Sequence, residues 1–333
     1  MTTGLRIGVV GATGVLGSEV LALLEESSLP VRELVLVATD RSLGHEIEFR
    51  GDSLPVESEP PKLRGLDLLF LCAPEGVCLE YARQALRAEV PCVDAAGALS
   101  SSHEVPLRVA AFGPSADPQK TPLVVAPPGP ALPWALILRP LHEAVGLRRV
   151  VGTALEAASC GGREGIESLY QESMAVFNQQ DLPESKIFSR AVAFDCIPAA
   201  GAAAEVCATD RETGVTGALE RLLDSDVKLA LTGVQVPAFV GLGGTAALEM
   251  ADELDPKRAE ALLSQAPGVE LWEGETDGLT LRAAVGREEV LVGRVRRDES
   301  VEHGLLLWFA ADVLRLAAAN AVSLAVARLQ LHH

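Results

Sequence analysis

The sequence predicts an α/β protein of two domains, a doubly wound parallel sheet of the Rossmann type and an α+β domain built on a mixed sheet. In the first third of the chain, short apolar runs alternate with helical segments, a pattern typical of parallel strands joined by crossover helices. After about residue 148 the apolar runs are longer and fewer helices separate them. The length of 333 residues agrees, at roughly 100–200 residues per domain.

In the first domain each predicted strand is a short apolar run that ends in turn residues. The first run, residues 5–10 (LRIGVV), leads through a glycine turn into a helix at 18–27. Continuous apolar runs of this length indicate strands covered on both faces of a sheet. The further predicted elements are strands at 33–38, 66–74, 91–97 and 121–127, and a helix at about 79–88.

In the second domain the predicted strands are longer and form a mixed sheet. A helix is predicted at 164–178, and a final Ala/Leu/Val-rich helix at 305–329. The predicted strands are residues 148–160, 191–197, 230–240, 279–285 and 290–297.

Composition limits the classes of partner. The net charge is −18 and the pI about 4.8, which argues against nucleic acid or an anionic membrane, because both require clustered Lys and Arg. There is no secretory signal and no apolar run long enough to span a membrane. The six cysteines show no C-x-x-C pair and no Cys/His cluster, so we predict no metal and a reducing cytoplasm.

A glycine-rich turn follows the first strand. Gly11, Gly14 and Gly17 are spaced G-x-x-G-x-x-G between a strand and a helix. Such a turn lets the backbone approach a pyrophosphate, and the helix N-terminus offers free N–H groups to it. The predicted cofactor contacts are Gly11, Thr13, Gly14, Val15 and Leu16. The alternative is a tight turn that binds nothing.

The second predicted strand ends in Thr39-Asp40-Arg41-Ser42. Thr39, Arg41 and Ser42 suit a 2′-phosphate, because a guanidinium and hydroxyls match phosphate geometry. Asp40 instead favours NAD, because an acidic residue at the end of the second strand binds the ribose hydroxyls of that cofactor. We therefore favour NADP over NAD as cofactor; the alternative is that Arg41 is an ordinary solvated arginine.

The chain resembles the aspartate-semialdehyde dehydrogenase family nearly end to end. The resemblance implies a homodimer and two domains, residues 1–128 with 308–333 for the nucleotide and residues 129–307 for dimerisation and, in the family, catalysis. The matching segments are GATGVLGSEVL (11–21), DRSLG (40–44), LRPLHEAVGLRRVVGTALEAASCGGREGIESL (138–169), VPAFVG (236–241) and VGRVRRDESVEHGLLLWFAADVLRLAAANAVSLA (292–325).

The family works by covalent catalysis: a cysteine thiolate attacks the aldehyde, hydride passes to NADP, and phosphate splits the thioester. Its nucleophile lies in Asn-Pro-Asn-Cys-Ser-Thr. Here the corresponding stretch is APPGPA at 126–131, which puts Gly129 at the cysteine position. Pro128 stands where an asparagine would help to hold the oxyanion, and it lacks even a backbone N–H.

Other family positions have also changed. Leu242 follows the Val-Pro segment where the catalytic histidine is expected, and Gln235 precedes it where an arginine is expected. Glu156 replaces a glutamine, and residues 94–100 read DAAGALS instead of Asp-Asn-Ser-Ser-Ala-Phe-Arg. Changes in separate segments, each flanked by matching scaffold, indicate a site that has been emptied.

Cys160 and Glu156 are candidate replacements for the missing groups, and Asn320 is a candidate cofactor contact. Cys160 lies in a loop that the resemblance places beside the active site, and it needs a cationic neighbour to ionise; we favour a packed, unreactive thiol. Glu156 is a candidate base, although a lone carboxylate is more often surface or salt-bridged. Asn320, on the last helix, either contacts the cofactor or serves helix packing.

We therefore favour a catalytically inactive, NADP-binding homodimer with a regulatory or sensor role. The alternative is an active NADP-dependent oxidoreductase on an aldehyde or acyl substrate, with rearranged groups around Cys160. A third hypothesis makes the chain the heteromeric partner of an active paralogue.

Overall fold

The computed structural model describes residues 4–39, 42, 44–58, 63–113, 122–185, 187–199, 201, 208–224 and 226–330. The chain divides into two compact units: Met1–Pro128 with Ala317–His333, and Gly129–Leu316. We expected the chain to return to the first unit at about residue 308. That position lies inside a strand of the second sheet, and the return is at Ala317.

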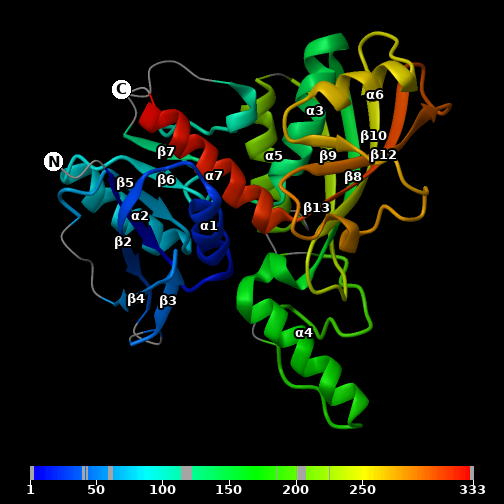
Figure 1. Ribbon diagram of the computed structural model, residues 1–333. Coiled ribbons are helices and arrows are strands. Elements are labelled where there is room, and N and C mark those ends of the chain that lie inside the picture. The colour runs from blue at the N-terminus through cyan, green and yellow to red at the C-terminus, as the bar shows by residue number, and fades with distance from the viewer. Residues whose placement is uncertain are drawn as a thin grey trace. The chain divides into compact units, whose positions relative to one another are not determined.

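The first unit contains a seven-stranded sheet (Figure 1). Its order is β3-β4-β2-β1-β5-β6-β7. In this order, the strands from β4 onwards pair in parallel with their neighbours. The edge strand β3 pairs antiparallel with β4 in a hairpin. The bounds are β1 Leu5–Val10, β2 Val31–Val37, β3 Glu46–Phe49, β4 Asp52–Glu57, β5 Leu68–Leu71, β6 Cys92–Asp94 and β7 Leu123–Val125.

Helices α1 (Val15–Glu26) and α7 (Val313–Gln330) pack with this sheet in one hydrophobic core. The α7 part of that core consists mainly of alanines such as Ala318 and Ala321, and small side chains let a helix approach its neighbours closely. Helix α2 (Glu75–Arg87) contacts β5 and β6, and a short 3₁₀ helix spans Ala110–Phe112. The predicted Rossmann-type domain is confirmed.

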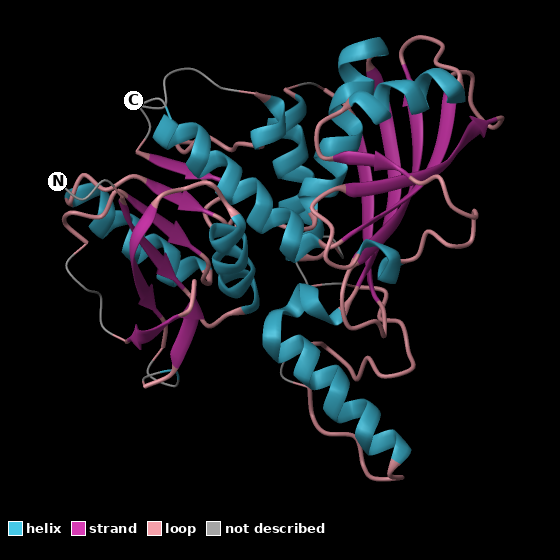
Figure 2. Cartoon of the chain, viewed as in Figure 1, coloured by secondary structure: helices cyan, strands magenta, loops and turns pink. Residues whose placement is uncertain are grey.

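The second unit contains a six-stranded mixed sheet in the order β11-β12-β13-β10-β8-β9 (Figure 2). Strands β8 and β9 are parallel, whereas β10 pairs antiparallel with both β8 and β13. The bounds are β8 Leu147–Glu156, β9 Lys228–Gln235, β10 Leu242–Met250, β11 Val269–Leu271, β12 Val290–Asp298 and β13 Gly304–Ala311. The predicted α+β domain with a mixed sheet is confirmed.

Helices α3 (Ala131–Val145), α5 (Asp210–Leu223) and α6 (Pro256–Gln265) pack together beside this sheet, and α4 (Gly162–Phe177) follows a 3₁₀ turn at Ala158–Gly161. A side chain at Gly152 would collide with the ring of Trp134 from α3, so only glycine allows this close packing. The Trp134 ring also meets Phe309 edge to face at 4.7 Å. Alternate residues of β8, including Gly152 and Glu156, therefore face the helices.

Three sequence predictions for this unit were wrong. Residues 279–285 form no strand but a 3₁₀ helix at Leu281–Ala284, begun by the Thr280 side chain. Residues 191–197 form only one bridge, because the buried carboxylate of Glu172 accepts the N–H groups of Val192 and Ala193. The predicted helix at 305–329 begins at Val313, and its first part is the central strand β13.

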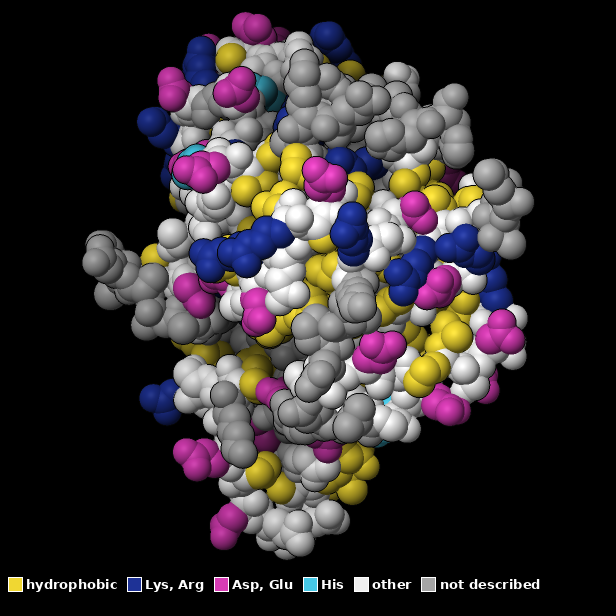
Figure 3. Space-filling view, turned by 90° about the vertical axis from the view of Figure 1, so that its left-hand side faces the viewer, with side chains coloured by type: hydrophobic (Ala, Val, Ile, Leu, Met, Phe, Trp, Pro, Cys, Tyr) yellow, Lys and Arg dark blue, Asp and Glu magenta, His cyan; other side chains and the backbone are white. Residues whose placement is uncertain are grey.

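The surface carries charges of both signs. On the face shown in Figure 3, Lys and Arg side chains lie among Asp and Glu side chains, so the net negative charge does not form one acidic surface there. Within the described ranges, no helix is long and apolar enough to cross a membrane. The same residues contain no group of three or more His, Cys, Asp or Glu that could hold a metal ion.

Candidate functional site

Three of the positions singled out in the sequence are neighbours in the second sheet. Leu242 of β10 pairs with Glu156 of β8, which pairs with Gln235 of β9. Leu242 is fully buried, and Glu156 and Gln235 are each 2% exposed. The Gln235 amide Nε2 donates to the Glu156 carbonyl oxygen at 2.7 Å. The sheet thus brings these three residues into one row, which we call the end row.

Gly129 lies near the same end of the sheet. The next partner in the end row is Ala311 of β13, opposite Leu242, and Val313 follows two residues later. A Cβ atom built on Gly129 would have the Val313 carbonyl oxygen at 3.8 Å and the Val313 Cβ at 3.9 Å as its nearest neighbours. A Cβ atom at position 129 would therefore make only ordinary van der Waals contacts.

Arg211 is a residue of this region that sequence reasoning missed. Its Nη1 donates to Glu156 Oε2 at 2.5 Å, and its Nη2 donates to the Cys160 carbonyl oxygen at 3.3 Å. Thr209 and Glu212 cap α5 reciprocally and place Arg211 in its first turn. The Thr-x-x-Glu pattern could have predicted this helix start, although not the contact with Glu156, 55 residues away.

The carboxyl group of Glu156 is paired rather than free. Burial raises its pKa above the ordinary range, and the Arg211 guanidinium opposes that rise. A candidate base must have a lone pair available to the substrate, and this carboxylate is buried and bound to an arginine. Its geometry is that of a salt-bridged group.

Cys160 is not activated. Burial of its thiol raises the pKa to about 12, and the nearby Glu156 carboxylate adds to the rise, while Arg211 opposes it. The residue as a whole is half-buried. A nucleophilic cysteine needs a lowered pKa, so this thiol stays protonated at neutral pH.

The glycine turn of the first unit has the geometry of a phosphate cradle. Gly11 has φ +83°, and a side chain there, or at Gly17, would collide with backbone carbonyl groups. The turn is fixed by bonds from the Gly11 and Ala12 N–H groups to the Val37 carbonyl oxygen. No side chain caps α1 at Gly14, so the first N–H groups of the helix, those of Val15 and Leu16 among them, are available to an anion.

Two of the predicted cofactor residues meet beside this turn. Thr13 Oγ1 and Ser42 Oγ lie 3.0 Å apart, and the Ser42 N–H donates to the Thr39 carbonyl oxygen at 2.8 Å. The structure thus brings Thr13, Thr39 and Ser42 together at the ends of β1 and β2. Arg41 and its neighbour Asp40 lie outside the described residues.

Asn320 of α7 is held in place by the first unit and retains an unused donor. Its Oδ1 accepts from the Ala110 N–H at 2.8 Å. Its Nδ2 is buried and has no hydrogen-bond partner among the described residues. A buried amide with one unsatisfied N–H requires an explanation, and a nucleotide group that accepts a hydrogen bond would supply one.

Asp94 ends β6 and faces the turn that contains the changed residues 95–100. Its Oδ2 accepts from the Leu99 N–H at 2.8 Å. Burial raises its pKa to about 6, against the lowering effect of the backbone N–H groups of that turn. Gly97 has φ +66°, and a Cβ there would lie 2.6 Å from the Pro128 nitrogen, so this turn is tightly packed.

These features fit a dinucleotide in the first unit. The uncapped α1, which follows the glycine turn, and the Asn320 amide with its unsatisfied N–H are the groups that such a ligand would satisfy. The second unit, in contrast, offers neither an ionisable thiol nor an imidazole at the end row.

Comparison with known proteins also finds two domains. The family model "Semialdehyde dehydrogenase, NAD binding domain" matches residues 6–117, and "Semialdehyde dehydrogenase, dimerisation domain" matches residues 138–316. The chain is 30% identical to the aspartate-semialdehyde dehydrogenase of Aquifex aeolicus, over 97% of each chain. It is 32% identical to a USG-1 protein homolog of Azotobacter vinelandii, over 98% of each chain.

A solved structure gives the same result at the level of the fold. The crystal structure of aspartate semialdehyde dehydrogenase II from Vibrio cholerae matches 99% of this chain and 100% of its own, with a TM-score of 0.92 and 27% sequence identity. The two family models together match residues 6–117 and 138–316, and the relatives and the solved structure match nearly the whole length of the chain. The chain belongs to the aspartate-semialdehyde dehydrogenase family.

Proposed function

We propose that this family member binds NADP but does not carry out the phosphorylating oxidation of aspartate semialdehyde, and that its role is regulatory or that of a sensor. One observation carries the proposal: near the end row, Gly129 has no side chain, and Leu242 is a fully buried aliphatic residue. Covalent catalysis requires a nucleophile and a base within hydrogen-bond reach of each other. Neither position supplies one.

The alternative of an active enzyme built around Cys160 has less support. Burial of its thiol raises the pKa to about 12, and the cation next to it, Arg211, donates to Glu156. The burial and this pairing both oppose the thiolate that a covalent mechanism needs.

The cofactor proposal rests on the first unit. The N–H groups at Val15 and Leu16 would hold the pyrophosphate, Thr13 and Ser42 would hold the 2′-phosphate side, and Asn320 would donate to the far end. The bound nucleotide would supply a hydride acceptor. The paired hydroxyls of Thr13 and Ser42 favour NADP over NAD, because they can donate to phosphate oxygens.

Calorimetric titration tests this cofactor proposal. We expect NADP⁺ to bind in the micromolar range, about −8 kcal/mol, and more tightly than NAD⁺. A Ser42→Asp variant should lose most of its affinity for NADP⁺, since a carboxylate repels the 2′-phosphate, and should retain more of its affinity for NAD⁺. Ser42→Ala, which removes only the hydroxyl, should lose less. Absence of binding for both nucleotides would refute the cofactor proposal.

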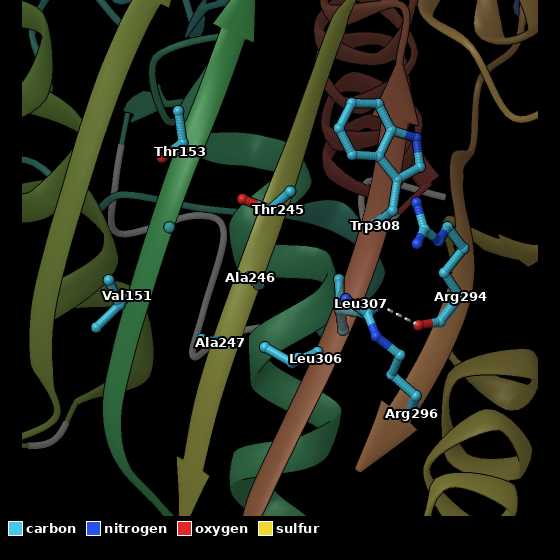
Figure 4. A pocket seen from close by; sticks show the side chains of 11 residues that line it. Val151, Thr153, Thr245, Ala246, Ala247, Arg294, Arg296, Leu306, Leu307 and Trp308 are labelled. Atoms are coloured by element: carbon cyan, nitrogen blue, oxygen red, sulfur yellow. Dashed lines mark hydrogen bonds between the residues drawn. The ribbon is translucent and has the colours of Figure 1, made fainter. Parts of the chain in front are cut away.

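We also propose a homodimer that pairs through the open face of the second sheet. A shallow hollow of about 190 Å³ lies on that face, and Figure 4 shows the side chains around it, with Thr245 near the centre and Arg294 and Arg296 at one edge. The half-buried Leu306 and Trp308 provide apolar area. The family model that covers this unit is named for dimerisation, which supports the proposal.

A further inference from the structure

The Arg211–Glu156 pair lies on the side of the second sheet that faces the helices. The Glu156 side chain is 3% exposed and the Arg211 side chain 26% exposed, with 2.5 Å between Nη1 and Oε2. A buried carboxylate loses much of its hydration, so a pair of this kind persists only when its geometry and further hydrogen bonds are good.

Arg211 is held in position by contacts that do not involve the Glu156 side chain. Its Nη2 donates to the Cys160 carbonyl oxygen. Its helix begins with the Thr209–Glu212 capping box, and Glu212 Oε1 also accepts from the Gly233 N–H of β9 at 2.9 Å. The first turn of α5 is thereby fixed to the sheet, and the guanidinium is preorganised whether or not residue 156 carries a carboxylate.

Among the described residues, the carboxylates that act on the guanidinium are Glu156, which is bonded to it, and the adjacent Asp210. The neighbours of Glu156 in the end row are the amide Gln235 and the aliphatic Leu242. Arg211 donates one charge-assisted hydrogen bond to Glu156, from Nη1 to Oε2, and a partly exposed guanidinium can bind the carboxylate of a ligand through the same kind of bond.

We infer that Arg211 is a carboxylate-binding group whose site is filled by the protein's own Glu156. A small external carboxylate will bind at Arg211 once the Glu156 side chain is removed, and will not bind there while it is present. This inference goes beyond the proposed function and does not depend on it, since an internal carboxylate occupies the site whether or not the protein turns over a substrate.

Chemical rescue of a Glu156→Ala variant tests the inference. Thermal unfolding is followed for wild type and variant at equal ionic strength, with sodium acetate or with the neutral, equally sized acetamide. We expect the variant to unfold several degrees below wild type, because Arg211 is left without its partner, and acetate to restore at least half of the loss. Acetamide should restore none, and acetate should not stabilise the wild type.

A Glu270→Ala variant is the matched control, because it breaks the exposed Arg287–Glu270 pair in the same unit. It should unfold close to wild type and show no response to acetate. Equal stabilisation of wild type and Glu156→Ala by acetate, or no effect of acetate on the variant, would overturn the inference.

If Glu156→Ala does not fold, Glu156→Gln and the double variant Glu156→Gln/Arg211→Met decide the question. The single change leaves an unpaired cation, and the double change removes it. We expect the double variant to unfold at a higher temperature than the single one. A double variant that is no more stable than Glu156→Gln contradicts the inferred pairing.

Discussion

At Gly129 the backbone leaves room for a side chain that the residue does not have. The nearest atoms to a Cβ there are at van der Waals distance, and the residue has no positive φ that would require glycine. Neither the space around the Cβ position nor the backbone conformation therefore requires glycine here.

A Gly129→Cys variant should fold with a free energy of unfolding within about 1 kcal/mol of wild type, because a new Cβ meets no obstacle. Gly97→Cys is the matched control: it has positive φ and a Cβ position in contact with Pro128, and it should lose about 1–3 kcal/mol or more. Urea denaturation measures both. Equal losses in the two variants would contradict the stated difference between these glycines.

Asp94 should make stability depend on pH. Burial raises its folded pKa to about 6, above the ordinary value of 3.8, so in the window between these two pH values the native state holds a proton that the unfolded state has lost. Stability therefore falls as pH rises through the window and stays reduced above it. Relative to Asp94→Asn, wild type should lose about 3 kcal/mol between acid and neutral pH, at 1.36 kcal/mol per pKa unit. Parallel pH profiles in urea denaturation would show that the carboxyl group is not perturbed.

The sequence allowed some of the site to be predicted at the residue scale. Gly129, Leu242, Gln235 and Glu156 were singled out because each stands in a segment that otherwise resembles the family, and the structure brings the last three into one row. Arg211 was missed because its partner is distant in sequence, and no local pattern indicates which carboxylate an arginine will meet.

At the scale of elements, two helical glycines differ in whether packing requires them. Gly17 allows α1 to lie against the carbonyl oxygen of Gly11, which is what brings the helix N-terminus to the turn. Gly214 lies inside α5, on an exposed part of the helix, and a Cβ there would meet nothing within 4 Å. Only the first glycine is required by packing.

Gly17→Ala should lower the free energy of unfolding by about 1–3 kcal/mol, through the clash with the turn, and should weaken NADP⁺ binding. Gly214→Ala should raise it by about 0.5–1 kcal/mol, because alanine loses less backbone entropy in a helix interior. Chemical denaturation of the two variants gives both signs in one experiment. Stabilisation by Gly17→Ala would contradict the close packing of the turn.

The sequence predicted the elements of the first unit better than those of the second. Its strands are continuous apolar runs with helices between them, a pattern that can be read locally. In the second unit, residues 304–311 continue into α7 with little change in composition, so β13 and the helix were read as one helix. Only pairing with β10 and β12 separates them. Residues 191–197 form no strand, because the N–H groups of Val192 and Ala193 donate to the Glu172 carboxylate.

At the scale of the whole molecule, the two units differ in what they retain. The first has a glycine turn and an uncapped helix that suit a dinucleotide. In the second, the positions that we propose as the former catalytic ones are glycine, leucine and a salt-bridged glutamate. Both units match their family models over most of their length. The proposed assembly depends on the second unit alone.

We expect a large charged side chain at Thr245 to prevent two chains from associating. Thr245 is exposed and lies near the centre of the open sheet face (Figure 4), so Thr245→Arg would add a bulky charge there and should convert a dimer into a monomer. Ser264→Arg, on an exposed position of α6, is the matched control and should remain dimeric. Analytical ultracentrifugation measures both. A monomeric wild type, or a dimeric Thr245→Arg variant, would contradict the proposed interface.

The central claim is that the nucleotide is bound without turnover, and a single-turnover assay tests it most directly. The protein is held in excess over NADP⁺, under conditions in which calorimetry shows binding, with aspartate semialdehyde and inorganic phosphate added. We predict no NADPH absorbance above that of a protein-free blank. Formation of NADPH in proportion to the NADP⁺ added would contradict the claim, and its loss in a Cys160→Ala variant would identify that thiol as the nucleophile.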